Sequence, residues 1–148
     1  MSLPLRIAAA TALAIAVDPV AAESRRTVAG PVQAHLVRVV DGDTIEVLAR
    51  IWPDHYVETL VRLAGIDAPE LRGRCPEEIA LADRAKERLT ALLAGHRLRL
   101  VDVHYGKYAG RVVARVLTED GRDAANVLLA ERLARPYDGR RRARWCAE

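Results

Sequence analysis

The chain has 148 residues, of which 51% are hydrophobic and 29% are charged, and its formal net charge at pH 7 is +3. This length and composition predict one globular domain with a single core and leave little room for a second domain. Basic residues gather within positions 97–115 and again within positions 140–144, which suits a polyanionic partner, although such clusters equally suit a solvated surface.

Residues 1–22 have the pattern of a cleaved secretory signal. Arg6 is their only cation, residues 7–17 are almost all apolar, and small residues follow at positions 20–22. An apolar stretch of about 11 residues is short against the roughly 20 that span a bilayer, so an uncleaved anchor is the lesser alternative. We therefore expect an exported protein, periplasmic or extracellular, whose mature chain begins with a flexible segment at 23–31.

Three strands are predicted next. Apolar and polar residues alternate over 36–40, the turn Asp41-Gly42-Asp43 follows, and alternation resumes over 44–48. A third strand covers 57–63 and ends near Gly65. The three strands are expected to form a meander.

Helices and further strands alternate in the second half. Pro76 begins a helix whose apolar positions recur at helical spacing until Gly95. Strands follow over 98–103 and 111–117, and a second helix, capped by Asp123, is predicted over 124–133. Five strands and two helices are compatible with a small closed barrel, although the pattern alone leaves other folds open.

The two cysteines are interpreted in the light of export. In an oxidising compartment Cys75 and Cys146 are expected to pair and to tie the C-terminal tail to the body of the protein, although two unpaired thiols remain the alternative. Neither cysteine has the spacing of a metal-binding motif, and the histidines do not supply one either. A zinc site is therefore improbable.

Three polar segments lie beside turns, where side chains can converge on a ligand. Residues 41–44 read Asp-Gly-Asp-Thr, and such a carboxylate pair can hold a hard divalent cation. Residues 62–70 place an arginine before two carboxylates and a proline bend, which suits phosphodiester hydrolysis. Residues 107–111 read Lys-Tyr-Ala-Gly-Arg, and these cations suit phosphate binding. Taken alone, the first segment is better explained as a solvated turn, the second is about as well explained as a polar surface loop, and the third is weak evidence.

In this order and at these separations, the three segments resemble the staphylococcal nuclease (thermonuclease) family, whose motifs are Asp-Gly-Asp-Thr, Arg followed by Asp-x-Pro-Glu, and Lys-Tyr-Gly-Arg. The likeness covers about residues 32–135. It implies an α+β, mainly β fold: a five-stranded OB-fold barrel with two or three helices over residues 32–137, followed by a basic C-terminal tail at 138–148. Shorter relatives from bacterial exopolysaccharide loci look more similar still.

The resemblance also implies a calcium site. Asp43 and Asp67 would bind Ca²⁺ through their carboxylates, and the backbone carbonyl of Ala68 would be a third ligand. Asp41 would lie just outside and orient these ligands.

The same resemblance assigns the catalytic and binding residues. Glu70 would be the general base, and Arg62 and Arg111 would neutralise the transition state. Lys107 and Tyr108 would bind a terminal phosphate. The implied substrate is DNA or RNA, and the implied products carry 3′-phosphates.

Two departures from the family pattern bear on activity. The segment at 107–111 is one residue longer than Lys-Tyr-Gly-Arg, which displaces either Arg111 or the Lys107–Tyr108 pair relative to the other. Ala68 stands where the best-known member has threonine, which leaves a carbonyl ligand untouched.

Two other functions therefore remain open. One is a catalytically weak or inactive OB-fold module that binds nucleic acid or saccharide, and the other is an accessory role in exopolysaccharide biosynthesis. Tyr137 would stack on a base or would simply be a surface tyrosine. Aromatic residues make up only 4% of the chain, so binding should depend mainly on phosphate contacts. A monomer is expected.

Overall fold

The computed structural model describes residues 27–107 and 110–146. The predicted signal at 1–22 and the position of Tyr108 therefore lie outside the described residues. Part of the segment predicted to be flexible, Thr27–Val28, forms the short strand β1, which pairs with β6 and so corrects that expectation for these two residues.

The described elements follow one another as β1 Thr27–Val28, β2 Val32–Asp41, β3 Thr44–Trp52, β4 His55–Leu63, β5 Ile66–Asp67, α2 Pro76–Leu93, β6 Arg97–Tyr105, β7 Arg111–Leu117, α3 Ala124–Ala130 and β8 Arg135–Pro136. The predicted meander is β2–β3–β4, with antiparallel pairing throughout.

Five of the strands close into a barrel. The sheet runs β1-β6-β2-β3-β4-β7, and an additional pairing between β6 and β7 completes the circle. β4 and β7 are parallel, whereas the other barrel pairs are antiparallel. The described part of the chain is mainly β with two helices, which confirms the fold class expected from the sequence.

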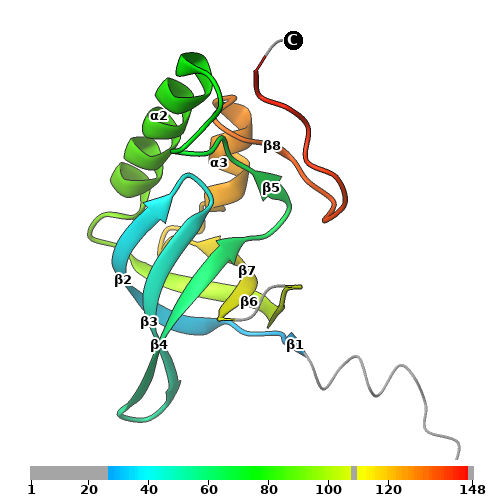
Figure 1. Ribbon diagram of the computed structural model, residues 1–148. Coiled ribbons are helices and arrows are strands. Elements are labelled where there is room, and N and C mark those ends of the chain that lie inside the picture. Colours follow the sequence, from blue (N-terminus) through cyan, green and yellow to red (C-terminus); the bar gives the residue numbers. More distant parts are fainter. Residues whose placement is uncertain (1–26, 108–109, 147–148) are drawn as a thin grey trace, which may run out of the picture.

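The core fills the barrel interior and the space beneath the helices. Alternate residues of the strands face inward, and Ile45, Val61 and Leu100 are at most 1% exposed. The apolar stripe of α2, including Leu89 and Leu92, is equally buried. Both helices lie at one end of the barrel, opposite the tip of the β3–β4 hairpin (Figure 1). Neither helix, in the part of the chain described, is long and apolar enough to cross a bilayer.

The second helix is shorter than predicted. The Asp123 side chain caps α3 by accepting from the backbone N–H groups of Ala125 and Asn126, as expected. The helix ends at Ala130 rather than at 133, because Arg132 adopts a left-handed conformation with φ 58°. The chain then turns back, and Leu133 is still buried.

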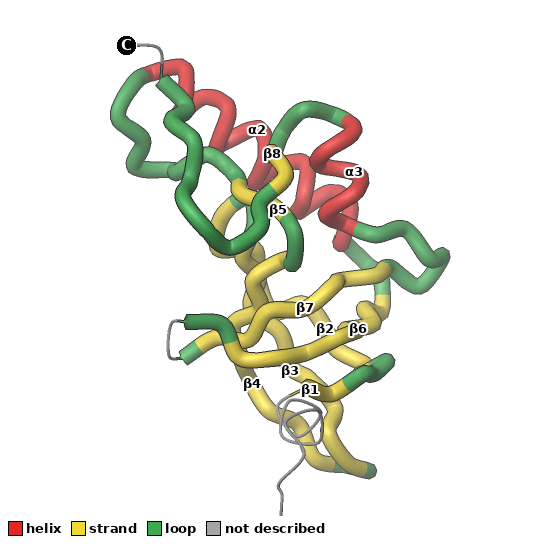
Figure 2. The backbone as a smooth tube through the Cα atoms, turned by 90° about the vertical axis from the view of Figure 1, so that its right-hand side faces the viewer, coloured by secondary structure: helices red, strands yellow, loops and turns green. Residues whose placement is uncertain are grey.

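The C-terminal segment, residues 137–146, returns across the helical end of the molecule. β8 pairs with β5, which places Arg135 opposite Asp67. The segment then passes β5 and continues toward the start of α2 (Figure 2). There Cys146 forms a disulfide with Cys75, with Cα atoms 6.0 Å apart.

Candidate active site

Three buried charged residues meet at the helical end of the barrel. Asp43 lies in the β2–β3 turn, Arg62 near the end of β4 and Asp67 in β5, and they are 4%, 8% and 5% exposed. The barrel register brings them together, because Thr44 pairs with Arg62 and the backbone N–H of Leu63 donates to the Asp43 carbonyl at 2.8 Å.

The Arg62 guanidinium holds this group in place. Its Nη1 donates to Asp43 Oδ1 at 2.6 Å, and its Nη2 donates to Asp67 Oδ1 at 3.3 Å and to the Ile66 carbonyl at 3.2 Å. A buried charge is tolerated only when it is paired and hydrogen-bonded, and Arg62 satisfies both conditions. The arginine therefore joins two loops that are distant in sequence.

Asp43 is fixed by further hydrogen bonds. Its Oδ1 accepts from the Thr44 hydroxyl at 2.9 Å, and its Oδ2 accepts from the backbone N–H of Ala68 at 3.0 Å. Asp41 lies behind it and accepts from the backbone N–H of Asp43 at 3.1 Å. Asp41 thus orients the turn that carries Asp43.

Carboxylate charge is crowded at this end of the barrel. Burial raises the pKa of Asp41, and the neighbouring charge of Asp43 raises that pKa further. Burial also raises the pKa of Asp67, with Asp43 adding to the rise while Arg142 and Arg62 oppose it. A bound cation would lower the pKa values of both Asp41 and Asp67 by stabilising their charged forms.

Glu70 and Arg142 form the outer edge of the site. Arg142 Nε lies 2.9 Å from Asp67 Oδ1, and Arg142 Nη1 donates to Glu70 Oε1. Burial lowers the pKa of Arg142, but the hydrogen bond to Glu70 and the charge of Asp67 outweigh that effect and raise the pKa above its usual range. Sequence reasoning placed Arg142 only in a basic tail, and the expected cysteine pairing was the only signal that this tail returns to the body.

A small cavity of about 70 Å³ lies among these side chains. Its lining contains both arginines and most of the carboxylates expected at the site: Asp41, Asp43, Arg62, Ala68, Pro69, Glu70, Arg111 and Arg142. Asp67 joins this group through its ion pairs with Arg62 and Arg142. β7 runs parallel to β4, and Arg111 in β7 pairs with Leu60 in β4. Arg111 therefore starts the strand that lies beside the strand carrying Arg62.

The donor set fits a hard cation such as calcium, because it consists of oxygen atoms from carboxylates. Within residues 27–107 and 110–146, one group of three potential ligand residues has its ligand atoms within 4.8 Å of one another: Cys75, Glu78 and Cys146. The two cysteines of this group form the disulfide. The carboxylates of the site are instead bridged by the guanidinium groups of Arg62 and Arg142. These two cations offset part of the carboxylate charge, while the pKa values of Asp41 and Asp67 stay raised.

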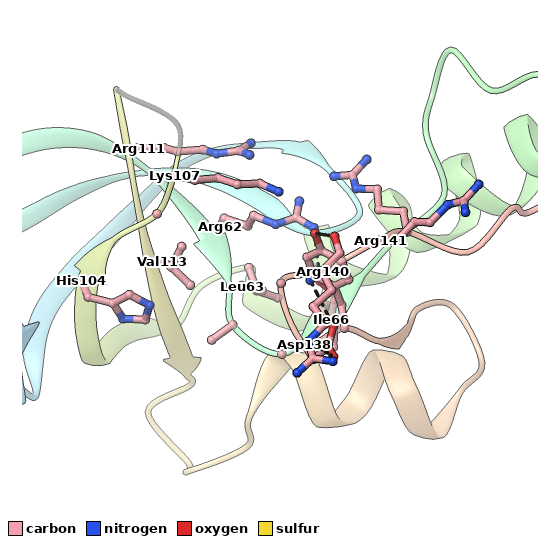
Figure 3. A pocket seen from close by; sticks show the side chains of 16 residues that line it. Arg62, Leu63, Ile66, His104, Lys107, Arg111, Val113, Asp138, Arg140 and Arg141 are labelled. Carbon is pink, nitrogen blue, oxygen red and sulfur yellow. Dashed lines mark hydrogen bonds and ion pairs between the residues drawn. The ribbon is translucent and has the colours of Figure 1, made fainter.

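A larger groove of about 800 Å³ adjoins the cavity, and its lining contains five arginines and Lys107 beside apolar residues and Asp138 (Figure 3). Arg62, Lys107 and Arg111 line it from the barrel. Tyr137 also lines it: its ring centre lies 5.8 Å from Arg62 Cζ, and its hydroxyl donates to the Arg140 carbonyl at 2.9 Å. The groove therefore suits a polyanion, whereas stacking of Tyr137 on a base stays a prediction.

Comparison with known proteins identifies relatives. A family model described as staphylococcal nuclease homologue matches residues 60–145, a range that contains Arg62, Asp67, Glu70 and Arg111 but begins after Asp43. Protein ParB from Escherichia coli is 37% identical over 112 residues, which cover 73% of this chain and 52% of ParB. The chain thus spans about half the length of that relative, whose name states no activity.

Proposed function

Because the chain belongs to the family of staphylococcal nuclease homologues, we propose that it is a calcium-dependent endonuclease that hydrolyses phosphodiester bonds of DNA or RNA and leaves 3′-phosphate ends. The observation that carries this proposal is the buried Asp43–Arg62–Asp67 network, which adjoins one small cavity together with Glu70 and Arg111. Such an arrangement combines acidic ligands, a base and two phosphate-binding cations.

Calcium would be held by the carboxylates of Asp43 and Asp67 and by the Ala68 carbonyl, with Asp41 orienting the Asp43 turn. When bound, calcium supplies positive charge that polarises the phosphodiester. The hydrogen bond from the Ala68 N–H to Asp43 Oδ2 keeps the proposed ligand segments together. This arrangement reduces the reorganisation that ligand binding requires.

The two arginines are proposed to stabilise the transition state. Negative charge builds on the phosphoryl oxygens during attack, and guanidinium groups donate two aligned hydrogen bonds to such oxygens. Arg62 is held rigidly by its buried partners, whereas Arg111 borders both the small cavity and the large groove. Lys107, Tyr108 and Tyr137 are proposed to bind the flanking parts of the substrate.

Glu70 is proposed as the general base. Its side chain is 53% exposed at the edge of the cavity, so water reaches it. As a water oxygen bonds to phosphorus, the water proton passes to the Glu70 carboxylate and the bond from phosphorus to the 5′ oxygen breaks. The 5′ oxygen takes a proton from solvent, and the phosphate stays on the 3′ side.

A binding module without catalysis is the second candidate. The ion pair between Arg142 and Glu70 favours it, because the Glu70 carboxylate is occupied by the guanidinium instead of facing a water molecule. Export to an oxidising compartment is proposed for either function, and the disulfide between Cys75 and Cys146 supports it.

Digestion of denatured DNA by the purified protein tests the proposed function. We expect digestion with calcium, none with a chelator, and a loss of at least ~100-fold in Glu70→Gln, which is typical of a lost general base. Glu87→Gln on the exposed face of α2 is the matched control and should digest normally. Unchanged digestion by Glu70→Gln would remove Glu70 from the mechanism, and no digestion at any pH or calcium concentration would favour the binding module.

A further inference from the structure

The C-terminal segment is fastened to the body of the protein at both ends. At its start, the Tyr137 backbone N–H donates to the Gly65 carbonyl at 2.9 Å. At its end, Cys146 is bonded to Cys75, and the Arg135 guanidinium stacks 3.8 Å from the ring centre of Trp145. Arg135 Nη1 also donates to the Arg144 carbonyl at 2.8 Å. The segment is therefore held in a defined position along its length.

This position turns its arginines toward the large groove. Arg140, Arg141 and Arg142 line the groove and are all exposed, while Lys107 and Arg111 line it from the barrel. Figure 3 shows Lys107 and Arg111 on the barrel side and Arg140 and Arg141 on the C-terminal side. A strand lying in the groove would thus meet positive charge on both of its sides.

Arg142 reaches furthest toward the proposed reaction centre. Its guanidinium contacts Asp67 and Glu70, yet its side chain remains 41% exposed and lines both the small cavity and the groove. An arginine keeps its charge throughout the physiological pH range and donates in a fork that matches phosphate oxygens. Arg142 is therefore placed where a phosphate passes from the groove into the cavity.

We propose that the disulfide-anchored C-terminal segment is a second phosphate-binding wall of the groove. Arg142 binds a phosphate next to the one that is cleaved, and Arg140 and Arg141 bind phosphates further along the same single strand. This inference rests on the proposed nuclease function and names how the substrate backbone is held. Because these contacts are to phosphate, they carry no sequence preference.

The opposite role of Arg142 makes a different prediction. If the Arg142 guanidinium blocked the site by competing with calcium and substrate for Asp67 and Glu70, removing this guanidinium would strengthen substrate binding and accelerate digestion. As part of a binding wall, its removal weakens binding. The two roles are therefore separated by the sign of one effect.

Binding of a fluorescent oligothymidine, measured by anisotropy in chelator over a series of salt concentrations, tests the proposal without cleavage. Each lost phosphate contact lowers the slope of log K against log salt by about 0.7 for single strands. We expect Arg142→Gln to weaken binding and lower the slope by about 0.7, and the triple change of Arg140, Arg141 and Arg142 to Gln to lower it by about 2. Arg122→Gln, whose side chain pairs with Asp120 beyond the groove lining, should leave the slope unchanged.

Cys146→Ser tests the role of the anchor. Release of the segment should lower the slope as the triple change does, and digestion should show a higher KM with kcat nearly retained. If Cys146→Ser fails to fold, Arg142→Gln still tests whether the C-terminal segment binds phosphate. An unchanged slope in Arg142→Gln, or tighter binding and faster digestion, would overturn the proposal. Absence of digestion by the wild type would contradict the proposed nuclease function. The slopes of log K against log salt would still test phosphate binding by the C-terminal segment.

Discussion

Arg62 is the residue on which the site depends most, because it neutralises two buried carboxylates at once. Removing one partner of a buried ion pair leaves the other charge uncompensated, which costs far more than the loss of a surface pair. The stability of the site and its chemistry are thus coupled in one side chain.

Arg62→Met should lower the free energy of unfolding at pH 7 by about 3 kcal/mol or more. Arg38→Met is the matched control, since Arg38 pairs with Glu46 while its side chain is 59% exposed, and its loss should cost about 1 kcal/mol or less. Urea unfolding in chelator measures both values. Equal stability of Arg62→Met and the wild type would contradict the described network.

The site residues that the family resemblance implies lie close together in the structure, while their roles stay predictions. Asp41, Asp43, Arg62, Glu70 and Arg111 line one cavity, because each lies at a strand end or turn that the barrel brings to the same place. Arg142 was not accessible from the sequence in this way. Its position depends on a disulfide and a chain reversal, and no local pattern in a run of arginines specifies either one.

At the scale of the elements, the β2–β3 turn is fitted closely against α2 and the segment after β5. A Cβ atom added to Gly42 would lie 2.8 Å from the Cβ atoms of both Ala68 and Ala85. Real Cβ contacts are almost never this short, so the turn or its neighbours would have to move. Because Asp43 follows directly, this packing also positions a proposed calcium ligand.

Gly42→Ala should therefore lower the free energy of unfolding by about 1–3 kcal/mol, the usual cost of overpacking. The apparent affinity for calcium in the digestion assay should fall as well, because Asp43 is displaced. Ala91→Leu, which adds volume on the exposed face of α2, should affect neither quantity appreciably. A Gly42→Ala protein with wild-type stability and calcium response would show that this packing is unimportant.

The turn between β7 and α3 provides a pH-dependent interaction. The buried Thr118 hydroxyl donates to Asp120 Oδ1 at 2.5 Å, and this hydrogen bond, followed by the contact with Arg122, holds the pKa of Asp120 below its usual value of 3.8. When the pKa of a carboxyl is lower in the folded state than in the unfolded state, the ionised carboxylate stabilises the fold at pH values above the unfolded-state pKa. This stabilisation is lost as the pH falls through the folded-state pKa.

Asp120→Asn should accordingly lower the melting temperature at neutral pH, and the difference from the wild type should shrink once the pH falls below about 3.8. Thermal unfolding followed by circular dichroism at several pH values measures this. A difference that is the same at pH 7 and pH 3 would contradict an ionic origin.

The longer elements were predictable because their hydrophobic period is clear, as in β3 and α2. The two-residue strands β1, β5 and β8 were not, because two residues define no period and their pairing depends on distant partners. The end of α3 was also misplaced. Leu133 continues the apolar stripe, but the left-handed backbone at Arg132 ends the helix before it.

For the whole molecule, the disulfide sets the course of the chain end. It closes a loop with a sequence separation of 71 residues. A loop of that size gives about 4 kcal/mol in the chain-entropy account of disulfides, most of it through the unfolded state.

Reduction should therefore lower the free energy of unfolding by about 2–4 kcal/mol, since measured effects often fall below the entropic value. Guanidinium unfolding with and without reductant measures the change, and a free-thiol count under denaturing conditions without reductant should give none. Two reactive thiols in that count would reject the pairing of Cys75 with Cys146.

The most direct measurement of the central claim is the chemical identity of the ends formed on a single-stranded oligonucleotide. With calcium, mass spectrometry should find new 3′-phosphate and 5′-hydroxyl ends, and with chelator it should find none. Cleavage that persists in chelator, or products that carry 5′-phosphate and 3′-hydroxyl ends, would contradict the proposed calcium-dependent chemistry of this site.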